Sequence, residues 1–164
     1  MGIIVGGGLR KPVSRIDSLV FARDTPYETR LAYRPPAPER VLAPAVAEAA
    51  RKALIGVVES GTAQRLKSVF TLADGSRLEV GGKTGTGDHR QDSLGKGGRV
   101  LSSRVLSRSA TLMFLLGEHH YGTVMVFVNE PHAADFRFTS SLPTALLKAM
   151  APSLGPLLAN PGCP

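Results

Sequence analysis

Two short, almost wholly apolar stretches in the C-terminal half constrain the fold of this chain more than any other feature. They cover residues 110–116 and 123–128, and a polar stretch over residues 118–122 separates them. Their lengths and the short separation predict a β-hairpin. Strands without polar alternation are usually covered on both faces, so we expect this hairpin to lie inside a layered structure.

Helices are predicted on both sides of this hairpin in the sequence. Residues 44–59 begin with Pro44, which suits a first helical turn, and end just before Gly61, a candidate C-cap. One face of this helix collects apolar residues, which are Val46, Ala50, Ala53, Leu54, Val57 and Val58. A later helix is expected to begin at a Ser141 cap and to stop at Pro152.

A second hairpin is predicted between the first helix and the apolar strands. Two β-branched stretches, residues 66–72 and 77–86, flank Asp74-Gly75, and this pair favours a tight turn because glycine accepts a positive φ. Residues 87–107 are polar, basic and contain glycine, and they are expected to form a loop. The order helix, hairpin, loop, hairpin, helix predicts an α+β fold, an antiparallel sheet covered by helices.

Length and composition fit one globular unit. The chain has 164 residues, of which 43% are apolar, enough to form a single buried core. We divide it into an irregular connector over residues 1–40, which could hold a strand over 13–22, a domain over 41–158 and a tail over 159–164.

Charge and cysteine content limit the classes of function. Lys and Arg total 20 against 13 Asp and Glu, and six of the basic residues fall between Lys83 and Arg108. This surplus allows an anionic partner, while an aromatic share of only 5% argues against nucleic-acid binders that stack bases. The lone Cys163 excludes an internal disulfide, and the four histidines lack metal-ligand spacing, so we expect no metal and no cofactor.

The sequence as written contains no targeting signal. Its longest apolar run, residues 110–116, is far shorter than a membrane span, and residues 1–5 are too short for a signal peptide. Taken literally, the chain is expected to be soluble and cytoplasmic.

The stretch with the clearest chemical content is Gly-Gly-Lys-Thr-Gly-Thr-Gly over residues 81–87. A phosphate-binding loop requires glycine at the position of Arg77 and should open a helix rather than end a strand, so that interpretation fails. A dinucleotide fingerprint is also absent. The remaining interpretation is the Lys-Thr-Gly element of serine acyl-transfer enzymes that bind penicillins.

Physical chemistry supports this interpretation for a strand that borders a cleft. Alternation puts Lys83 and Gly85 on one face and Thr84 and Thr86 on the other. Lysine supplies a fixed cation for a substrate carboxylate, threonine hydroxyls can donate to it, and free edge amides can pair with an extended peptide. Glycine leaves room where a side chain would meet the opposite wall.

Several stretches around this element share a family likeness. They are Val57-Val58-Glu59-Ser60-Gly61-Thr62-Ala63, residues 80–86, Arg108-Ser109-Ala110-Thr111, Phe138-Thr139-Ser140-Ser141-Leu142 and Thr25-Pro26-Tyr27-Glu28. On these stretches, most of residues 1–158 resembles the C-terminal part of the transpeptidase domain of class A penicillin-binding proteins. The likeness is more specific than the tripeptide alone, and it implies a partial penicillin-binding transpeptidase fold.

The resemblance also implies roles for the residues of this strand. Lys83, Thr84 and Thr86 would hold the terminal carboxylate of a D-Ala-D-Ala stem peptide or of a β-lactam, with Gly85 in the same substrate-binding wall. Thr86, through its backbone N–H in the oxyanion hole, and Lys83 would be the catalytic members. The family further implies peptidoglycan cross-linking, an inner-membrane anchor and a periplasmic catalytic domain.

The chain departs from the family in one large respect. The family's Ser-x-x-Lys nucleophile and Ser-x-Asn element precede Lys-Thr-Gly, and neither is found there in this chain. Ser93-Leu94-Gly95-Lys96 matches formally, but it follows the strand and lies among glycines that disfavour a helix. We therefore expect half of an active site without its attacking serine, inactive by itself, whose partner would be the remainder of the transpeptidase.

The alternative function is a non-catalytic basic module that binds nucleic acid or another polyanion. A steep loss of binding with rising salt would favour it, because phosphate contacts release counterions. Under the transpeptidase hypothesis, no nucleic-acid partner is expected.

Overall fold

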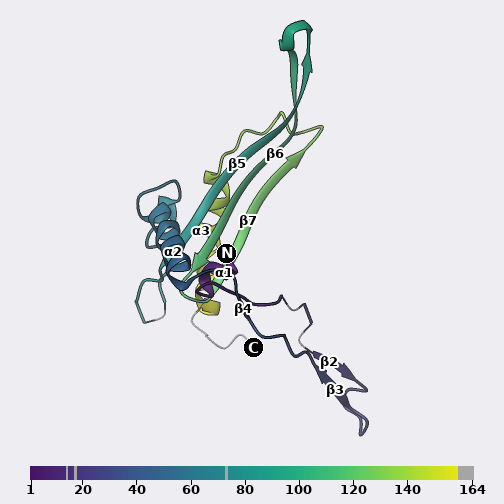
Figure 1. Cartoon of the computed structure of the whole chain (residues 1–164), viewed down its shortest axis with the longest axis vertical. Helices are drawn as coiled ribbons and strands as arrows, with labels where there is room; N and C mark the ends of the chain where they lie inside the picture. Colours follow the sequence, from purple (N-terminus) through teal and green to yellow (C-terminus); the bar gives the residue numbers. More distant parts are fainter. Residues whose placement is uncertain (14, 17, 73, 159–164) are drawn as a thin grey trace.

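A three-stranded antiparallel sheet organises the chain (Figure 1). The computed structural model describes residues 1–13, 15–16, 18–72 and 74–158. The strands are β5 (Val80–Leu94), β6 (Val100–Leu116) and β7 (His120–Asn129), with β6 in the centre. The predicted α+β fold with an antiparallel sheet is confirmed.

Two helices complete the main body. α2 (Pro44–Glu59) packs against β5, and α3 (Ser141–Leu158) lies along one face of the sheet (Figure 1). The apolar side chains buried in the core cluster include Val58, Leu66, Phe70, Leu112, Leu116 and Leu147. Burial of each such side chain stabilises the fold by about 1.5–3 kcal/mol. Because Val80 belongs to the same cluster, the core also fixes the start of β5.

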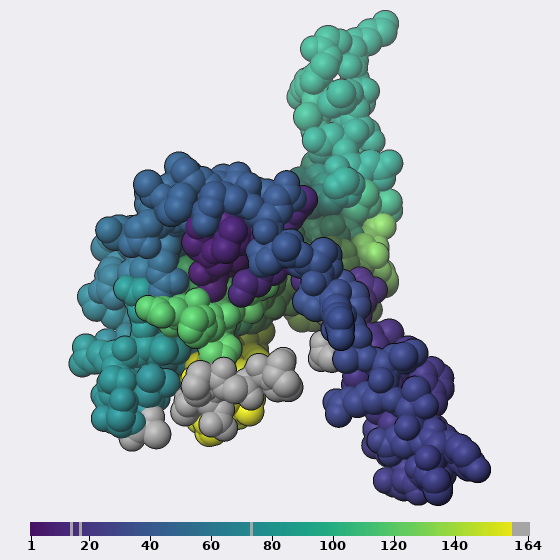
Figure 2. Space-filling model, turned by 60° about the horizontal axis from the view of Figure 1, so that its bottom comes forward, coloured from purple at the N-terminus to yellow at the C-terminus, as the bar shows by residue number. Residues whose placement is uncertain are grey.

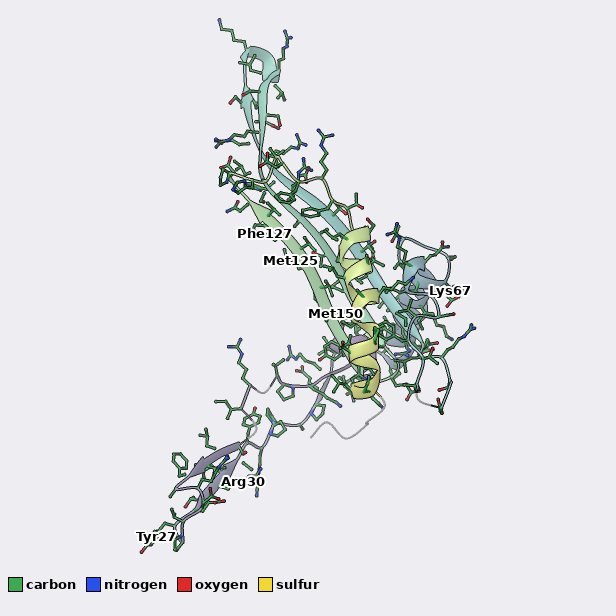
Figure 3. All side chains as sticks on the ribbon, turned by 180° about the vertical axis from the view of Figure 1, so that it is seen from behind. Tyr27, Arg30, Lys67, Met125, Phe127 and Met150 are labelled. Carbon is green, nitrogen blue, oxygen red and sulfur yellow. The ribbon has the colours of Figure 1, made fainter. Side chains whose placement is uncertain are left out.

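The first forty residues form small separate elements. They are α1 (Gly2–Val5), β1 (Leu9–Arg10) paired with β4 (Glu39–Arg40), and β2 (Ser18–Phe21) paired with β3 (Thr29–Ala32). The β2–β3 hairpin projects from one end of the body, with Tyr27 near its tip (Figures 1 and 3). β2 falls within residues 13–22, where the sequence could hold a strand.

The prediction of a loop over residues 87–107 is wrong. β5 and β6 continue through it as a two-stranded ribbon and turn at η2 (Lys96–Gly98), a 3-10 turn in which Gly97 and Gly98 have positive φ. The polar composition reflects exposure of both faces of the ribbon, not irregular structure. We call residues 89–106 the arm. It projects away from the body, in teal, in both views (Figures 1 and 2).

The prediction of a strand over residues 66–72 is mostly wrong. The segment starts inside a 3-10 turn, η1 (Gln64–Leu66), and a single bridge joins Thr71 to Arg77. Leu66 is fully buried, so its contribution to the core decides the local backbone against an extended strand.

The predicted turn at Asp74-Gly75 is confirmed. Gly75 has a φ of 81°, and the Asp74 carboxylate accepts hydrogen bonds from the amide and hydroxyl of Ser76 at 2.9 and 2.6 Å. These bonds favour the charged carboxylate and lower its pKa. The carboxylate therefore holds the turn at neutral pH and releases it as acid protonates Asp74.

The bounds predicted for α2 are confirmed, whereas its predicted buried face is rotated. The buried residues are Ala47 and Val58, and Val46 is 53% exposed. Gly61 follows the helix without a positive φ, and it is required for space, because a Cβ there would lie 2.9 Å from the Val57 carbonyl oxygen.

The predicted end of α3 at Pro152 is wrong, whereas its predicted start differs by one residue. The helix continues through Pro152 because Ala151 and Leu154 pack against the core and outweigh the missing amide. At its start, the Ser141 amide donates to the Thr139 hydroxyl at 3.3 Å, so Thr139 takes the capping role expected of Ser141.

One face of the apolar strands is covered over only part of its length, although both faces were predicted to be covered. α3 covers the face of Leu112 and Val124. On the opposite face, Tyr121, Met125 and Phe127 are each more than half exposed, and Figure 3 shows the last two along β7. Leu115, on the same face of β6, is fully buried, so the open part of this face is the stretch with Met113, Met125 and Phe127. An exposed apolar stretch of this kind is typical of a surface that another element or partner covers.

The core assignment predicts unequal effects for two adjacent residues of β6. Leu112→Ala removes a fully buried side chain and should lower the free energy of unfolding by about 2–5 kcal/mol. Met113→Ala, on the open face with 43% exposure, should cost less than half of that. Urea unfolding followed by circular dichroism measures both, and equal losses would contradict the placement of the core.

Candidate functional site

The Lys-Thr-Gly element lies on β5, an edge strand of the sheet. Among the described residues, β5 pairs only with β6, so its outer edge has no neighbouring strand. Lys83 stands opposite Met113, and Thr86 stands opposite Ala110. Over the described residues, the strand that carries Lys-Thr-Gly therefore has one edge without a ladder partner.

Hydrogen bonding at the base of the sheet decides which amides of β5 face outward. The Gly117 N–H donates to the Glu79 carbonyl at 2.8 Å, which makes these two residues a hydrogen-bonded pair. Pairs alternate along an antiparallel ladder, so the amides of Lys83 and Gly85 point to β6. The N–H of Thr86, one residue further, then points to the free outer edge.

The two threonine side chains lie on the face that α3 covers, and neighbouring residues hold both. The Thr84 and Thr62 hydroxyls lie 2.6 Å apart, and the Thr86 hydroxyl accepts the Ser140 N–H at 2.9 Å. Because Thr86 uses an oxygen lone pair for this contact, its own hydroxyl proton stays available for a ligand. Thr62 and Ser140 were not predicted as site residues, although both lie in stretches that carry the family resemblance.

Lys83 is exposed on the opposite face of the strand. Its ammonium bends round to donate to the Thr84 carbonyl at 2.6 Å. That carbonyl belongs to the outward-facing set, so the positive charge lies at the same free edge as the Thr86 N–H. The structure thus gathers a cation, an amide donor and a hydroxyl donor along one short edge.

Gly85 does not border a wall formed by the described residues. A Cβ built at Gly85 would meet nothing within 4 Å, although the sequence predicted an opposing surface there. Close approach instead occurs at Gly81 and Gly82, where a Cβ would lie 3.1 Å from the Ile55 nitrogen and 2.8 Å from the Met113 carbonyl oxygen. These two glycines seat β5 against α2 and β6.

Ser93 and Lys96 are not brought to this edge. Ser93 lies far out on the ribbon opposite Ser102, and Lys96 lies in the turn η2. Ten residues of extended strand separate Ser93 from Lys83, which is about 33 Å. The formal Ser-x-x-Lys match therefore has neither the helix nor the location of a nucleophile at this site.

An ion pair between Arg108 and Asp88 lies between the Lys-Thr-Gly element and the arm. Arg108 donates to both carboxylate oxygens of Asp88, at 3.2 and 2.9 Å, and also to the Ala133 carbonyl at 3.0 Å. Arg90 makes a longer contact with Asp88, at 3.4 Å. Both contacts to Asp88 come from one guanidinium nitrogen of Arg108, and the two side chains are partly buried, so this ion pair joins the facing strands at the base of the arm.

We also searched the described residues for a metal site and for a membrane-spanning helix. No group of three or more His, Cys, Asp or Glu side chains there could hold a metal ion. Over the same ranges, no helix is both long and apolar enough to cross a membrane. Cys163 and the predicted tail over residues 159–164 lie outside the described residues.

The arrangement of sheet, helices and edge strand is part of a penicillin-binding protein fold. Solved structures of penicillin-binding protein 3 from Mycobacterium tuberculosis match it. The apo form aligns with a TM-score of 0.57 at 19% identity. The complexes with aztreonam and ampicillin each give a TM-score of 0.54, at 19% and 20% identity.

These alignments cover 99% of this chain but only 34–35% of the matched chains, so the chain spans about a third of their length. At this identity the likeness establishes the fold, and it does not distinguish class A from other penicillin-binding proteins. No family model and no curated protein matches the sequence.

The close approach at Gly82 predicts different outcomes for two glycines of one strand. Gly82→Ala forces a Cβ against the Met113 carbonyl and should lower the unfolding free energy by about 1–3 kcal/mol. Gly85→Ala enters open space and should change it by about 0.5 kcal/mol or less. Thermal unfolding measures both, and a large loss for Gly85→Ala would show that a wall already borders it.

Proposed function

We propose that this chain supplies the substrate-carboxylate and oxyanion wall of a serine D,D-transpeptidase that cross-links peptidoglycan. The observation that carries the proposal is the position of Thr86, whose N–H points to the free edge of β5 while its hydroxyl proton is unused. The penicillin-binding fold around this strand supports the same function.

In the proposed reaction, a D-Ala-D-Ala stem peptide lies along the outer edge of β5. Lys83 and the Thr84 and Thr86 hydroxyls hold its terminal carboxylate, and Gly85 leaves room for the peptide. The Thr86 N–H donates to the carbonyl oxygen as negative charge develops there, a contact worth about 3 kcal/mol. A β-lactam carboxylate and carbonyl would occupy the same positions.

The attacking serine and its lysine must come from outside this chain. The open face of β7 supports this part of the proposal, because Tyr121, Met125 and Phe127 form a surface ready to be covered. We propose the remainder of a class A transpeptidase domain as that cover, on the stretches of family likeness. A membrane anchor and a periplasmic location would belong to the assembled protein.

The missing nucleophile predicts that the chain by itself forms no covalent adduct with a fluorescent penicillin. A gel read by fluorescence tests this, with an intact penicillin-binding protein labelled alongside as the positive control. Mass spectrometry of the chain should show its unmodified mass. An adduct on any serine, Ser93 included, would contradict the proposal.

When the part that carries Ser-x-x-Lys and Ser-x-Asn is supplied, Lys83→Ala should slow acylation more than Arg99→Ala. Loss of one charge-assisted contact costs roughly 1.5–3 kcal/mol, or about ten- to a hundredfold in rate. Arg99 is an exposed cation of the arm, and its steering effect should fade with salt.

Measured at low and high salt, the Lys83→Ala effect should persist while the Arg99→Ala effect disappears. Equal effects that both vanish at high salt would mean that Lys83 is merely part of a basic surface. The acyl-transfer interpretation of β5 would then be abandoned.

A further inference from the structure

The tip of the arm carries apolar side chains that the rest of the described chain does not cover. Leu94 is 63%, Val100 51% and Leu101 69% exposed. Leu94 and Val100 are cross-strand partners and share one face of the ribbon. Leu101 follows Val100, so its side chain points to the other face, over Gly95. The tip is therefore apolar on both faces.

Two cations lie in the turn between these apolar side chains. Lys96 and Arg99 are exposed and form no ion pair with any described residue. The other basic residues nearer the body are already engaged, Arg90 with Asp88 and Arg104 with Glu130. The turn also satisfies part of its own backbone, since the Gly95 N–H donates to the Arg99 carbonyl at 2.8 Å. Both charged side chains of the turn are thus cations, and the one carboxylate of the arm is Asp92 on β5.

The second projecting hairpin provides an internal comparison. The β2–β3 hairpin also exposes apolar side chains, with Tyr27 near its end (Figure 3). Its tip, however, carries the carboxylates Asp24 and Glu28, which an anionic surface repels. The turn of the arm, residues 95–99, carries only cations, whereas the hairpin turn, residues 22–28, carries Arg23 together with these two carboxylates.

We propose that the tip of the arm docks on an anionic lipid surface. Leu94, Val100 and Leu101 would enter the interface, while Lys96 and Arg99 contact the headgroups. A tip that is apolar on both faces favours end-on entry into a fluid layer, because a protein groove would contact mainly one face. The absence of aromatic side chains in the arm argues against a site that stacks nucleic-acid bases. The proposal does not depend on acyl transfer.

Co-sedimentation of the full chain with sucrose-loaded vesicles tests the proposal. One set contains phosphatidylcholine alone, and the other contains equal parts of phosphatidylcholine and phosphatidylglycerol. The chain should bind the second set and not the first. Leu94→Ser with Leu101→Ser should weaken binding at least about tenfold, from the loss of apolar burial. Lys96→Gln with Arg99→Gln should weaken it about thirtyfold, from two headgroup contacts.

Matched controls separate docking from unfolding. Tyr27→Ser changes an exposed apolar side chain of the other hairpin and should leave vesicle binding unchanged. The urea midpoints of all variants should equal that of the native chain, because the altered side chains are exposed.

Three results would overturn the proposal. The first is equal binding to both vesicle sets, and the second is full binding by the Leu94→Ser, Leu101→Ser variant. The third is tighter binding to duplex DNA than to vesicles, lost in the charge variant alone, which would establish a polyanion-binding module instead. None of these results bears on the adduct test or on Lys83, so the two proposals fail separately.

Discussion

The pairing of β6 with a strand on each side is the constraint on which the rest of the structure depends. Alternate backbone amides of a central strand bond to its two neighbours. Once one hydrogen bond between β5 and β6 is known, the direction of every N–H and C=O group of β5 in the regular ladder follows. The bond from Gly117 to Glu79 sets that phase. It leaves the Thr86 N–H at a free edge, and a shift of one residue would turn it into the ladder. The core around Leu112 holds this register by burying one face of β6.

The candidate site is consequently a property of backbone geometry more than of side-chain clustering. Thr62 and Ser140 hold the two threonines from α2's exit and α3's entry, so elements distant in sequence define the orientation of one short strand. Lys83 is exposed, and its ammonium donates to the Thr84 carbonyl at the outer edge of β5. An outward amide beside an exposed cation is the arrangement that the proposed carboxylate and oxyanion wall needs.

Sequence patterns predicted those features that local chemistry dictates. Pro44 and the apolar periodicity predicted the bounds of α2, Asp74-Gly75 predicted a turn, and the β-branched stretch over residues 77–86 predicted the strand that holds Lys83 to Thr86. The patterns failed where long-range pairing decides the backbone. Residues 87–107 have a loop-like composition, yet cross-strand hydrogen bonds extend them into the arm. The hydrogen bonds of Thr62 and Ser140 with the threonines of β5 could not be predicted, because a local sequence pattern does not indicate which residue of a distant element will contact a strand.

The continuity of β5 has a mechanical consequence. β5 carries Lys83 within the body and continues to the tip of the arm, where Lys96 lies in the turn η2. A force on the tip would therefore act on the same strand that holds Lys83. The ion pair of Arg108 with Asp88 lies between those points, and the same guanidinium also donates to the Ala133 carbonyl. A load applied to the tip would be carried along β5 toward the strand segment with Lys83 and Thr86. The ladder between β5 and β6, together with the ion pair of Arg108 and Asp88, resists the resulting twist.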